Sequence, residues 1–298
     1  MTIGQITTTA PRRRFVTSWG LAAASSFLLL AACDREVRLE GERFSTDIPL
    51  SATAPGANAS TLALADTGAS EGPRAIALPA AVDLGSWEQR GYNASNRTPH
   101  ASLGGNLTQV WSAEIGRGNS RRTRITADPV TADGRVFTMD SVAGVVATSL
   151  STGEALWGAD LQPGFDRGGT VSGGGLAVSG GTLFATTGFG ELVAMDAASG
   201  AIRWRQRLSA GIGAPTVSGG SVFVVSRNNQ GWALDAGTGR ITWQVPGNSA
   251  PALLTGGAAP AITDRLVVFP FGSGELAGTL RQSGAPLCIT SAHPIGAR

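Results

Sequence analysis

The C-terminal two thirds of the chain alternate short apolar runs with clusters of turn-forming residues. Residues 176–204 contain three such runs, and each run is bounded by Gly, Ser, Thr or Asp. Apolar runs with these boundaries predict consecutive antiparallel strands joined by tight turns. The same pattern occurs in residues 129–157 and 215–243, and it begins again at Pro260. The sequence therefore predicts several copies of one strand-rich unit.

Each copy ends in the same motif, Gly-x-x-x-Trp. The motif is formed by Gly153 and Trp157, by Gly200 and Trp204, and by Gly239 and Trp243. The fourth copy has Gly284 followed by Cys288 where Trp is expected, and Trp111 closes a similar run, LTQVW, ahead of the first copy. Successive motifs are about 40–50 residues apart, a period that is typical of β-propeller blades with four strands each.

The predicted fold is all-β, a β-propeller with four-stranded antiparallel blades. Full blades are expected at about residues 125–161, 170–208 and 211–246, and a fourth from about 257 has a damaged closing strand because the pattern fails after Pro286. This makes about three and a half of roughly eight blades. A ring of about eight blades needs on the order of 340 residues. We therefore expect the chain to be a C-terminally truncated version of a longer protein.

The residues that mark the repeat have structural explanations. Asp196 and Asp235 stand shortly before the motif glycines, where an Asx side chain can cap a turn. The glycine supplies the positive φ that such turns often need. The tryptophan is expected to open the last strand and to fill the wedge between neighbouring blades. Ala147, Ala194 and Ala233 leave room for that ring. We expect no catalytic role for these residues.

Composition argues against several functional classes. The 298 residues carry a formal net charge of +2, only 15% of them are charged, and glycine occurs 42 times. A weak net charge gives no reason to expect binding to nucleic acid. Asp128, Asp133 and Asp140 have no metal-ligand spacing, and His100 and His293 lie outside the blades. We therefore expect a protein that is not an enzyme and has no cofactor or metal.

The N-terminus has the pattern of an export signal. Arg12–Arg14 precede an apolar run at Leu21–Ala32, which is too short to span a bilayer. The run ends in LLLAAC at Cys33 and resembles a bacterial lipobox. The resemblance implies cleavage of residues 1–32 and lipidation of Cys33, which would anchor the protein to a membrane. The three arginines also resemble a twin-arginine signal, and Sec export and twin-arginine export both stay open.

The remaining segments divide the chain further. Residues 33–86 are predicted to be the lipidated N-terminus and a flexible linker, 87–290 a partial propeller, and 291–298 an aberrant tail. Residues 107–115 have the pattern of a strand that lacks earlier partners. Residues 119–124, NSRRTR, form a basic cluster that is either a solvated loop or a contact for acidic groups on a partner.

Three features together resemble the outer-membrane protein assembly factor B (BamB-type) lipoproteins, which are quinoprotein-like, PQQ-repeat β-propellers. These features are the lipobox at Leu30–Cys33, the lead-in WEQRGYN from Trp87, and blade endings such as ALDAGTGRITW. The resemblance implies a scaffold at the periplasmic face of the outer membrane. It also implies binding to the periplasmic domains of the β-barrel insertase subunit and help in inserting unfolded outer-membrane proteins. Asp34, next to the lipidated cysteine, leaves the inner membrane open.

The family's contacts with its partners are made by turns between strands on one face. The turns that match here are Gly188–Gly190, Asn228–Gln230 and Gly272–Gly274.

Three other functions stay open. The chain could be a fragment of a quinoprotein dehydrogenase that uses pyrroloquinoline quinone and Ca²⁺, a propeller module with an unrelated partner, or a non-functional truncated product.

Overall fold

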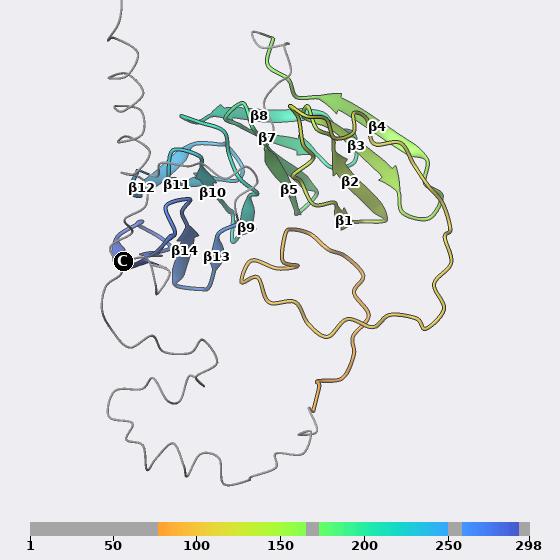
Figure 1. The fold of residues 1–298 in the computed structure, drawn as a ribbon, viewed down its shortest axis with the longest axis horizontal. Helices are drawn as coiled ribbons and strands as arrows, with labels where there is room; N and C mark the ends of the chain where they lie inside the picture. Colours follow the sequence, from red (N-terminus) through yellow and green to blue (C-terminus); the bar gives the residue numbers. More distant parts are fainter. Residues whose placement is uncertain (1–76, 165–172, 250–257, 292–298) are drawn as a thin grey trace, which may run out of the picture. The chain divides into compact units, whose positions relative to one another are not determined.

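The protein folds into four antiparallel sheets of four strands each (Figure 1). The structure, a computed structural model, describes residues 77–164, 173–249 and 258–291, which belong to one compact unit, Ala77–Arg298. Each sheet is one propeller blade, so the predicted fold class is confirmed. The described residues contain no helix with the length and apolar character that crossing a membrane requires.

The strand bounds repeat from blade to blade. Blade 1 contains β1 (Val130–Ala132), β2 (Arg135–Met139), β3 (Gly144–Ser149) and β4 (Ala155–Asp160). Blade 2 contains β5 (Gly174–Ser179), β6 (Thr182–Thr187), β7 (Glu191–Asp196) and β8 (Ile202–Arg207). Blade 3 contains β9 (Thr216–Ser218), β10 (Ser221–Ser226), β11 (Gln230–Asp235) and β12 (Ile241–Pro246). Blade 4 contains β13 (Ala261–Ile262), β14 (Leu266–Pro270), β15 (Glu275–Leu280) and β16 (Pro286–Ser291).

Strands pair in the order in which they follow one another along the chain. The first strands of neighbouring blades contact each other, β1 with β5, β5 with β9 and β9 with β13, and Figure 1 shows these strands on the inner side of the blades. The fourth strands β4, β8 and β12 are mostly exposed. Each blade therefore runs from an inner strand to an outer strand.

Blade 2 buries both of its faces against its neighbours, blades 1 and 3. In β6, Leu183 and Ala185 belong to the core that blade 2 shares with blade 1, whereas Phe184 belongs to the core that it shares with blade 3. Successive side chains of a strand point to opposite faces. A strand between two blades is therefore buried at every position, as β6 is. Burial of this apolar area is the main force that holds adjacent blades together.

Residues 87–96 run along the inner strands of all four blades and bond to each of them. The contacts are Trp87 N–H to the Thr131 carbonyl (3.0 Å), Val178 N–H to the Glu88 carbonyl (2.7 Å), Val217 N–H to Gln89 Oε1 (2.9 Å) and Ile262 N–H to the Ala94 carbonyl (2.7 Å). These bonds reach β1, β5, β9 and β13 in turn. The lead-in predicted from the sequence thus joins the blades at their inner edge.

Gln89 is the centre of this segment. Its backbone forms a bridge with Ala177 of β5, and its buried side chain accepts from Val217 N–H and donates to the Val217 carbonyl at 3.5 Å. The amide therefore satisfies both backbone groups of one residue of β9. Buried backbone groups without partners cost free energy, so this side chain fixes where the segment lies.

Residues 107–115 do not form the predicted strand. Leu107 and Val110 are exposed, with 71% and 80% of their surfaces accessible. A strand is stable only when its backbone groups pair with a neighbour, and no described strand lies beside this segment. The alternating pattern alone does not supply a strand to pair with.

Blade 4 differs from the prediction because its closing strand is intact. The six residues of β16 pair with β15 along their whole length, from Glu275 with Ser291 to Thr279 with Pro286. The expectation of a failed pattern after Pro286 was wrong. Backbone hydrogen bonds, which do not depend on the missing Trp, are sufficient for this pairing. The described residues therefore form four four-stranded blades rather than three and a half.

Candidate functional site

The motif tryptophans lie at the junctions between blades. The ring of Trp157, from β4, lies against Gly200 of the β7–β8 hairpin in blade 2. A Cβ atom on Gly200 would be 2.6 Å from Cε3 of that ring, so only glycine leaves room for it. The Trp157 indole N–H donates to the Ala197 carbonyl of the same hairpin at 3.2 Å. The tryptophan of one blade is thus bonded to the next blade.

The same contact occurs at every described junction. Gly153, Gly200, Gly239 and Gly284 contact Trp111, Trp157, Trp204 and Trp243, respectively. The four indole groups donate to the carbonyls of Leu150, Ala197, Ala236 and Arg281 at 2.9–3.2 Å. Trp111 therefore occupies the position of a preceding blade's tryptophan without being part of a strand. In blades 1–3 the tryptophan is the third residue of the last strand, not the first as expected.

Each motif tryptophan is the last member of a row of three side chains on adjacent strands of its own sheet. In blade 2, Phe184 pairs with Ala194, and Ala194 pairs with Trp204, on three adjacent strands. The rings of Phe184 and Trp204 are 6.0 Å apart, and small Ala194 lets them approach. In blade 4 the corresponding row consists of Val268, Gly278 and Cys288. All three positions are smaller there, and Cys288 is exposed.

Asp196 and Asp235 cap the β7–β8 and β11–β12 hairpins. Asp196 Oδ1 accepts from the backbone N–H groups of Ala198 and Ser199 and from the Ser199 hydroxyl. Asp196 Oδ2 accepts from Arg203 at 2.8 Å. The Arg203 guanidinium, followed by the Ser199 bonds, lowers the pKa of Asp196 from 3.8 to about 2. The Thr238 side chain and backbone N–H likewise lower the pKa of Asp235.

We expect the Asp196–Arg203 pair to make a small contribution to the free energy of unfolding that depends on pH. Because folding lowers this pKa, the pair stabilises the fold fully above the unfolded value near 4, and the contribution is lost as pH falls towards about 2. Arg203→Gln should lower the urea midpoint at about pH 6, and this decrease should become smaller as the pH falls towards about 2. Arg121→Gln, at an exposed position, is the matched control. An Arg203→Gln effect that does not change with pH would contradict this assignment.

The other candidates from the sequence form no site among the described residues. Cys33 and His293 lie outside the described residues, and His100 contacts the Pro79 carbonyl through Nδ1 at 2.8 Å. In the described ranges His, Cys, Asp and Glu form no group of three that could hold a metal ion. Asp140 accepts from the N–H groups of Val142 and Gly144 and thereby shapes the β2–β3 turn.

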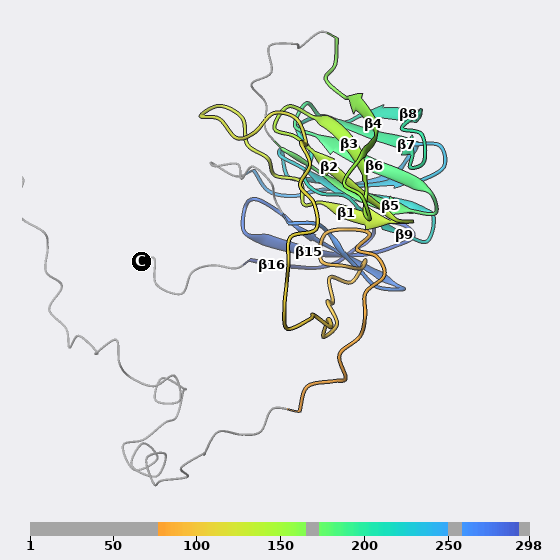
Figure 2. The same ribbon diagram turned by 90° about the vertical axis from the view of Figure 1, so that its right-hand side faces the viewer.

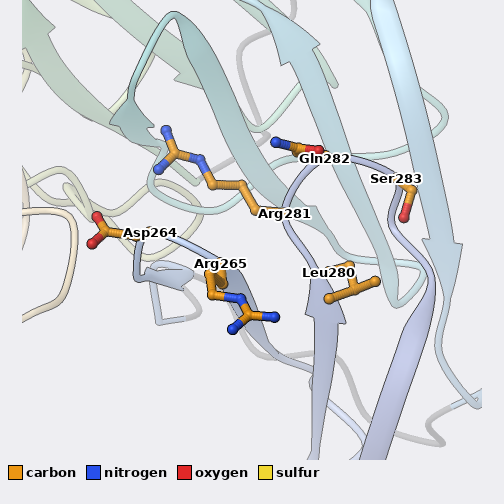
Figure 3. Close-up of a pocket in the computed structure, with 6 residues that line it drawn as sticks. All are labelled: Asp264, Arg265, Leu280, Arg281, Gln282 and Ser283. Atoms are coloured by element: carbon orange, nitrogen blue, oxygen red, sulfur yellow. The ribbon is translucent and has the colours of Figure 1, made fainter.

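A pocket of about 310 Å³ lies between the β13–β14 turn and the β15–β16 hairpin. Its lining includes Asp264, Arg265, Arg281 and Ser283. Figure 3 shows the two guanidinium groups pointing in different directions and Asp264 and Ser283 on opposite sides. Arg281 also donates to the Thr263 carbonyl at 3.4 Å. The pocket therefore does not bring its polar groups to one point.

The best candidate for a functional surface is a second feature that repeats in every blade. The turn between the second and third strands of each blade contains one residue with positive φ: Ala143, Gly190, Asn229 or Gly274. The carbonyls of the first three accept from the N–H groups of Leu161, Leu208 and Gly247, which follow the outer strands. These bonds tie the turns of blades 1–3 to the connections that follow their outer strands. We call the surface formed by residues 140–143, 188–190, 227–229 and 271–274 the turn face.

Blades 3 and 4 are joined most closely on the turn face. The side chain of buried Asn229 accepts from Gly272 N–H at 2.9 Å and donates to the Asn248 carbonyl. Asn248 donates through its backbone and side chain to the carboxylate of Glu275, which also accepts from Ser273. The bonds from Ser273 and then Asn248 lower the pKa of Glu275. The turn sequence indicated a contact loop, but it did not indicate this network.

All three turns proposed from the resemblance lie on the turn face. Gly188–Gly190 is the β6–β7 turn, Asn228–Gln230 is at the start of β11, and Gly272–Gly274 is the β14–β15 turn. Of these residues, Asn228, Gly272 and Gly274 are exposed, whereas Gly188 and Gly190 are buried. Hydrogen bonds hold the turns in place, so they form a preorganised surface of the kind that protein docking favours.

Comparison with known proteins supports this architecture. A family model described as outer membrane protein assembly factor BamB matches residues 141–292. Quinohemoprotein alcohol dehydrogenase from Comamonas testosteroni has a similar fold, with a TM-score of 0.55 and 20% identity over 72% of this chain and 42% of that one. The quinohemoprotein alcohol dehydrogenase ADHIIG from Pseudomonas putida HK5 has a TM-score of 0.53 and 19% identity over 74% of this chain and 43% of that one. A comparison with curated proteins gave no significant match.

BamB from Moraxella catarrhalis is also similar, with a TM-score of 0.45 and 19% identity over 60% of this chain and 52% of that one. The chain spans about half, or less, of the length of these solved structures. At these identities the solved structures establish the fold alone. The family model covers half of the chain. The chain therefore belongs to the PQQ-repeat β-propeller family whose model is described as outer membrane protein assembly factor BamB.

Proposed function

We propose that the protein is a scaffold of the outer-membrane β-barrel assembly machinery and has no enzymatic activity. In this proposal Cys33 carries the lipid that anchors it at the periplasmic face of the outer membrane, and residues 34–86 are the tether. The turn face binds the periplasmic domains of the insertase subunit and helps unfolded outer-membrane proteins to reach it. The observation that carries the proposal is the family match over residues 141–292.

The arrangement of the turn face also supports a docking role. Its turns are fixed by backbone bonds to the blade connections, so binding would not have to order them. The carboxylates nearest to these turns, Asp140 and Glu275, are buried and bonded within the chain. On the turn face, Asn228, Gly272 and Gly274 are the exposed residues, and they present backbone and one small polar side chain, which suits recognition of another protein surface.

The test is crosslinking in cells followed by affinity purification of the tagged full chain. We expect to recover the insertase subunit, and to recover less of it with Asn228→Arg, which adds bulk and charge to the turn face. Gln282→Arg adds the same group at the exposed β15–β16 hairpin and should have no effect. Cys33→Ser should leave the membrane fraction. Consistent absence of the insertase subunit, with a full-length family member as positive control, would refute the assembly role.

A dehydrogenase is the alternative that the same fold allows. Quinoprotein enzymes need a carboxylate base and oxygen ligands for Ca²⁺ that converge on one site. The dehydrogenases with similar structures share the fold at about 20% identity. Purified chain mixed with pyrroloquinoline quinone and Ca²⁺ should give no dye-linked oxidation of alcohols or sugars. Clear turnover would favour the enzyme over the scaffold.

A further inference from the structure

Residues 117–124, which we call the arginine loop, are the most concentrated positive charge in the described chain. The sequence RGNSRRTR places Arg117, Arg121, Arg122 and Arg124 within eight residues, and all four are exposed. Arg122 and Arg124 also interact within the chain. Arg117 and Arg121 form no ion pair with any described carboxylate. The loop projects from blade 1 beside β3, as the yellow segment in Figure 2 shows.

The base of the loop is fixed to the β2–β3 turn of blade 1. Arg117 N–H donates to Asp140 Oδ2 at 3.0 Å, and the Arg117 carbonyl accepts from Ser141 N–H. The buried Ser141 hydroxyl donates to the Gly118 carbonyl at 2.8 Å and accepts from the Thr123 hydroxyl. Both ends of the loop are thus bonded to one turn. That turn is part of the turn face.

The tip of the loop is ordered by its own side chains. Ser120 Oγ accepts from the N–H groups of Arg122 and Thr123, and Ser120 N–H donates to the Thr123 carbonyl. Asn119 Oδ1 accepts from Ile125 N–H at 2.7 Å. The Ser120 bonds are those of a tight ST-turn, and the Asn119 bond closes the loop across six residues. The backbone that carries the arginines is therefore preorganised, so little ordering is needed before it binds a partner.

The described carboxylates near the loop form no ion pair with Arg117 or Arg121. Asp140 uses Oδ1 for Val142 and Gly144 and Oδ2 for the Arg117 backbone, and it is buried beneath the loop. Asp128 pairs with Arg90 at 3.1 Å. The chain as a whole has a net charge of only +2. The positive charge of the loop is therefore a local feature rather than a general property of the surface.

We propose that the arginine loop is a docking element for a protein segment that presents clustered Asp and Glu carboxylates. Guanidinium groups bind carboxylates through two parallel hydrogen bonds, which gives geometric specificity as well as charge attraction. Arginine is also enriched at protein interfaces and their hot spots. The proposal goes beyond the assembly role, because it names the chemistry of a partner's surface and holds whichever protein carries it.

Two observations favour a protein over a lipid surface. The arginine loop contains no apolar or aromatic side chain that could enter the membrane interface. Attraction of basic segments to anionic lipid depends on total charge and needs no fixed backbone. Here buried hydrogen bonds to Ser141 and Asp140 fix the backbone. A fixed array suits a partner whose carboxylates also have fixed positions.

The test measures binding of a fluorescein-labelled octaglutamate peptide to the full chain by fluorescence anisotropy. Arg117→Glu combined with Arg121→Glu should raise the Kd at least about tenfold. The matched control combines Arg240→Glu, in the β11–β12 hairpin, with Arg265→Glu, in the β13–β14 turn. Both positions are exposed, and the change in net charge is the same. This control should change the Kd less than about twofold. Thermal melts check that each variant is folded.

A second variant tests the preorganisation. Ser120→Ala keeps every charge but removes the acceptor that orders the tip, and we expect it to raise the Kd about threefold to fivefold. No change would refute a preorganised loop. If the two charge-reversal variants lose peptide affinity equally, the peptide does not bind specifically at the arginine loop, and the proposal is refuted. Loop-dependent binding to vesicles that contain phosphatidylglycerol, without binding to the peptide, would assign the loop to the membrane and overturn the proposal.

Discussion

Trp204→Ala is expected to lower the free energy of unfolding by about 3 kcal/mol. Truncation of a buried Trp to Ala typically costs about 3–5 kcal/mol, and the lower end applies because Trp204 is half-buried. The lost contacts are the ring against Gly239, the indole N–H to the Ala236 carbonyl at 3.1 Å, and the ring of Phe184. Because the contacts with Gly239 and Ala236 join blade 2 to blade 3, the substitution weakens a junction as well as a single sheet.

Urea-induced unfolding monitored by circular dichroism measures this effect. Trp204→Phe is the matched variant, because it keeps an aromatic ring but removes the indole donor. It should cost about 1–2 kcal/mol, since one hydrogen bond and part of the ring are lost. If Trp204→Ala and Trp204→Phe both leave the urea midpoint unchanged, the ring does not hold the junction.

The sequence predicts the blades well because their signals are local. Alternating apolar residues with Gly and Asp turns define strands such as β6 and β7 whatever surrounds them. The Gly-x-x-x-Trp motif also encodes the junction, since Gly200 has positive φ and takes the ring of Trp157 from the previous blade. The same local logic places Asp196 and Asp235 at their turns.

The features that the sequence did not predict depend on neighbours far along the chain. Gln89 bonds to Val217, 128 residues away, and nothing near Gln89 indicates that partner. Asn229 looks like an ordinary turn residue, yet its side chain joins blades 3 and 4 through Gly272. Conversely, residues 107–115 have the pattern of a strand but do not form one, because none of the described strands pairs with them.

The candidate site shows the same division. The turn positions were predictable because Gly188–Gly190 and Gly272–Gly274 are typical turn sequences. The hydrogen bonds that hold these turns were not predictable, because Gly190 bonds to Leu208 after β8 and Gly272 bonds to Asn229 of the neighbouring blade. The basic cluster at residues 119–124 was visible, but its attachment to Asp140 and Ser141 required the fold.

Each blade is bonded to the next by a tryptophan whose ring packs against a glycine. A pair of substitutions in blade 2 tests this contact. Gly200 and Gly181 have nearly equal φ values, +74° and +70°. Alanine at either position therefore carries the same backbone strain, about 1–2 kcal/mol. Only at Gly200 would the new Cβ meet a ring, 2.6 Å from Cε3 of Trp157, whereas Gly181 has nothing within 4 Å.

Overpacking of this kind typically costs a further 1–3 kcal/mol or so. The decisive measurement is the difference in unfolding free energy between Gly200→Ala and Gly181→Ala under the same conditions. We expect Gly200→Ala to be less stable by about 2 kcal/mol. Equal losses for the two variants would show that Trp157 does not rest on Gly200, and the account of how the blades are joined would be wrong.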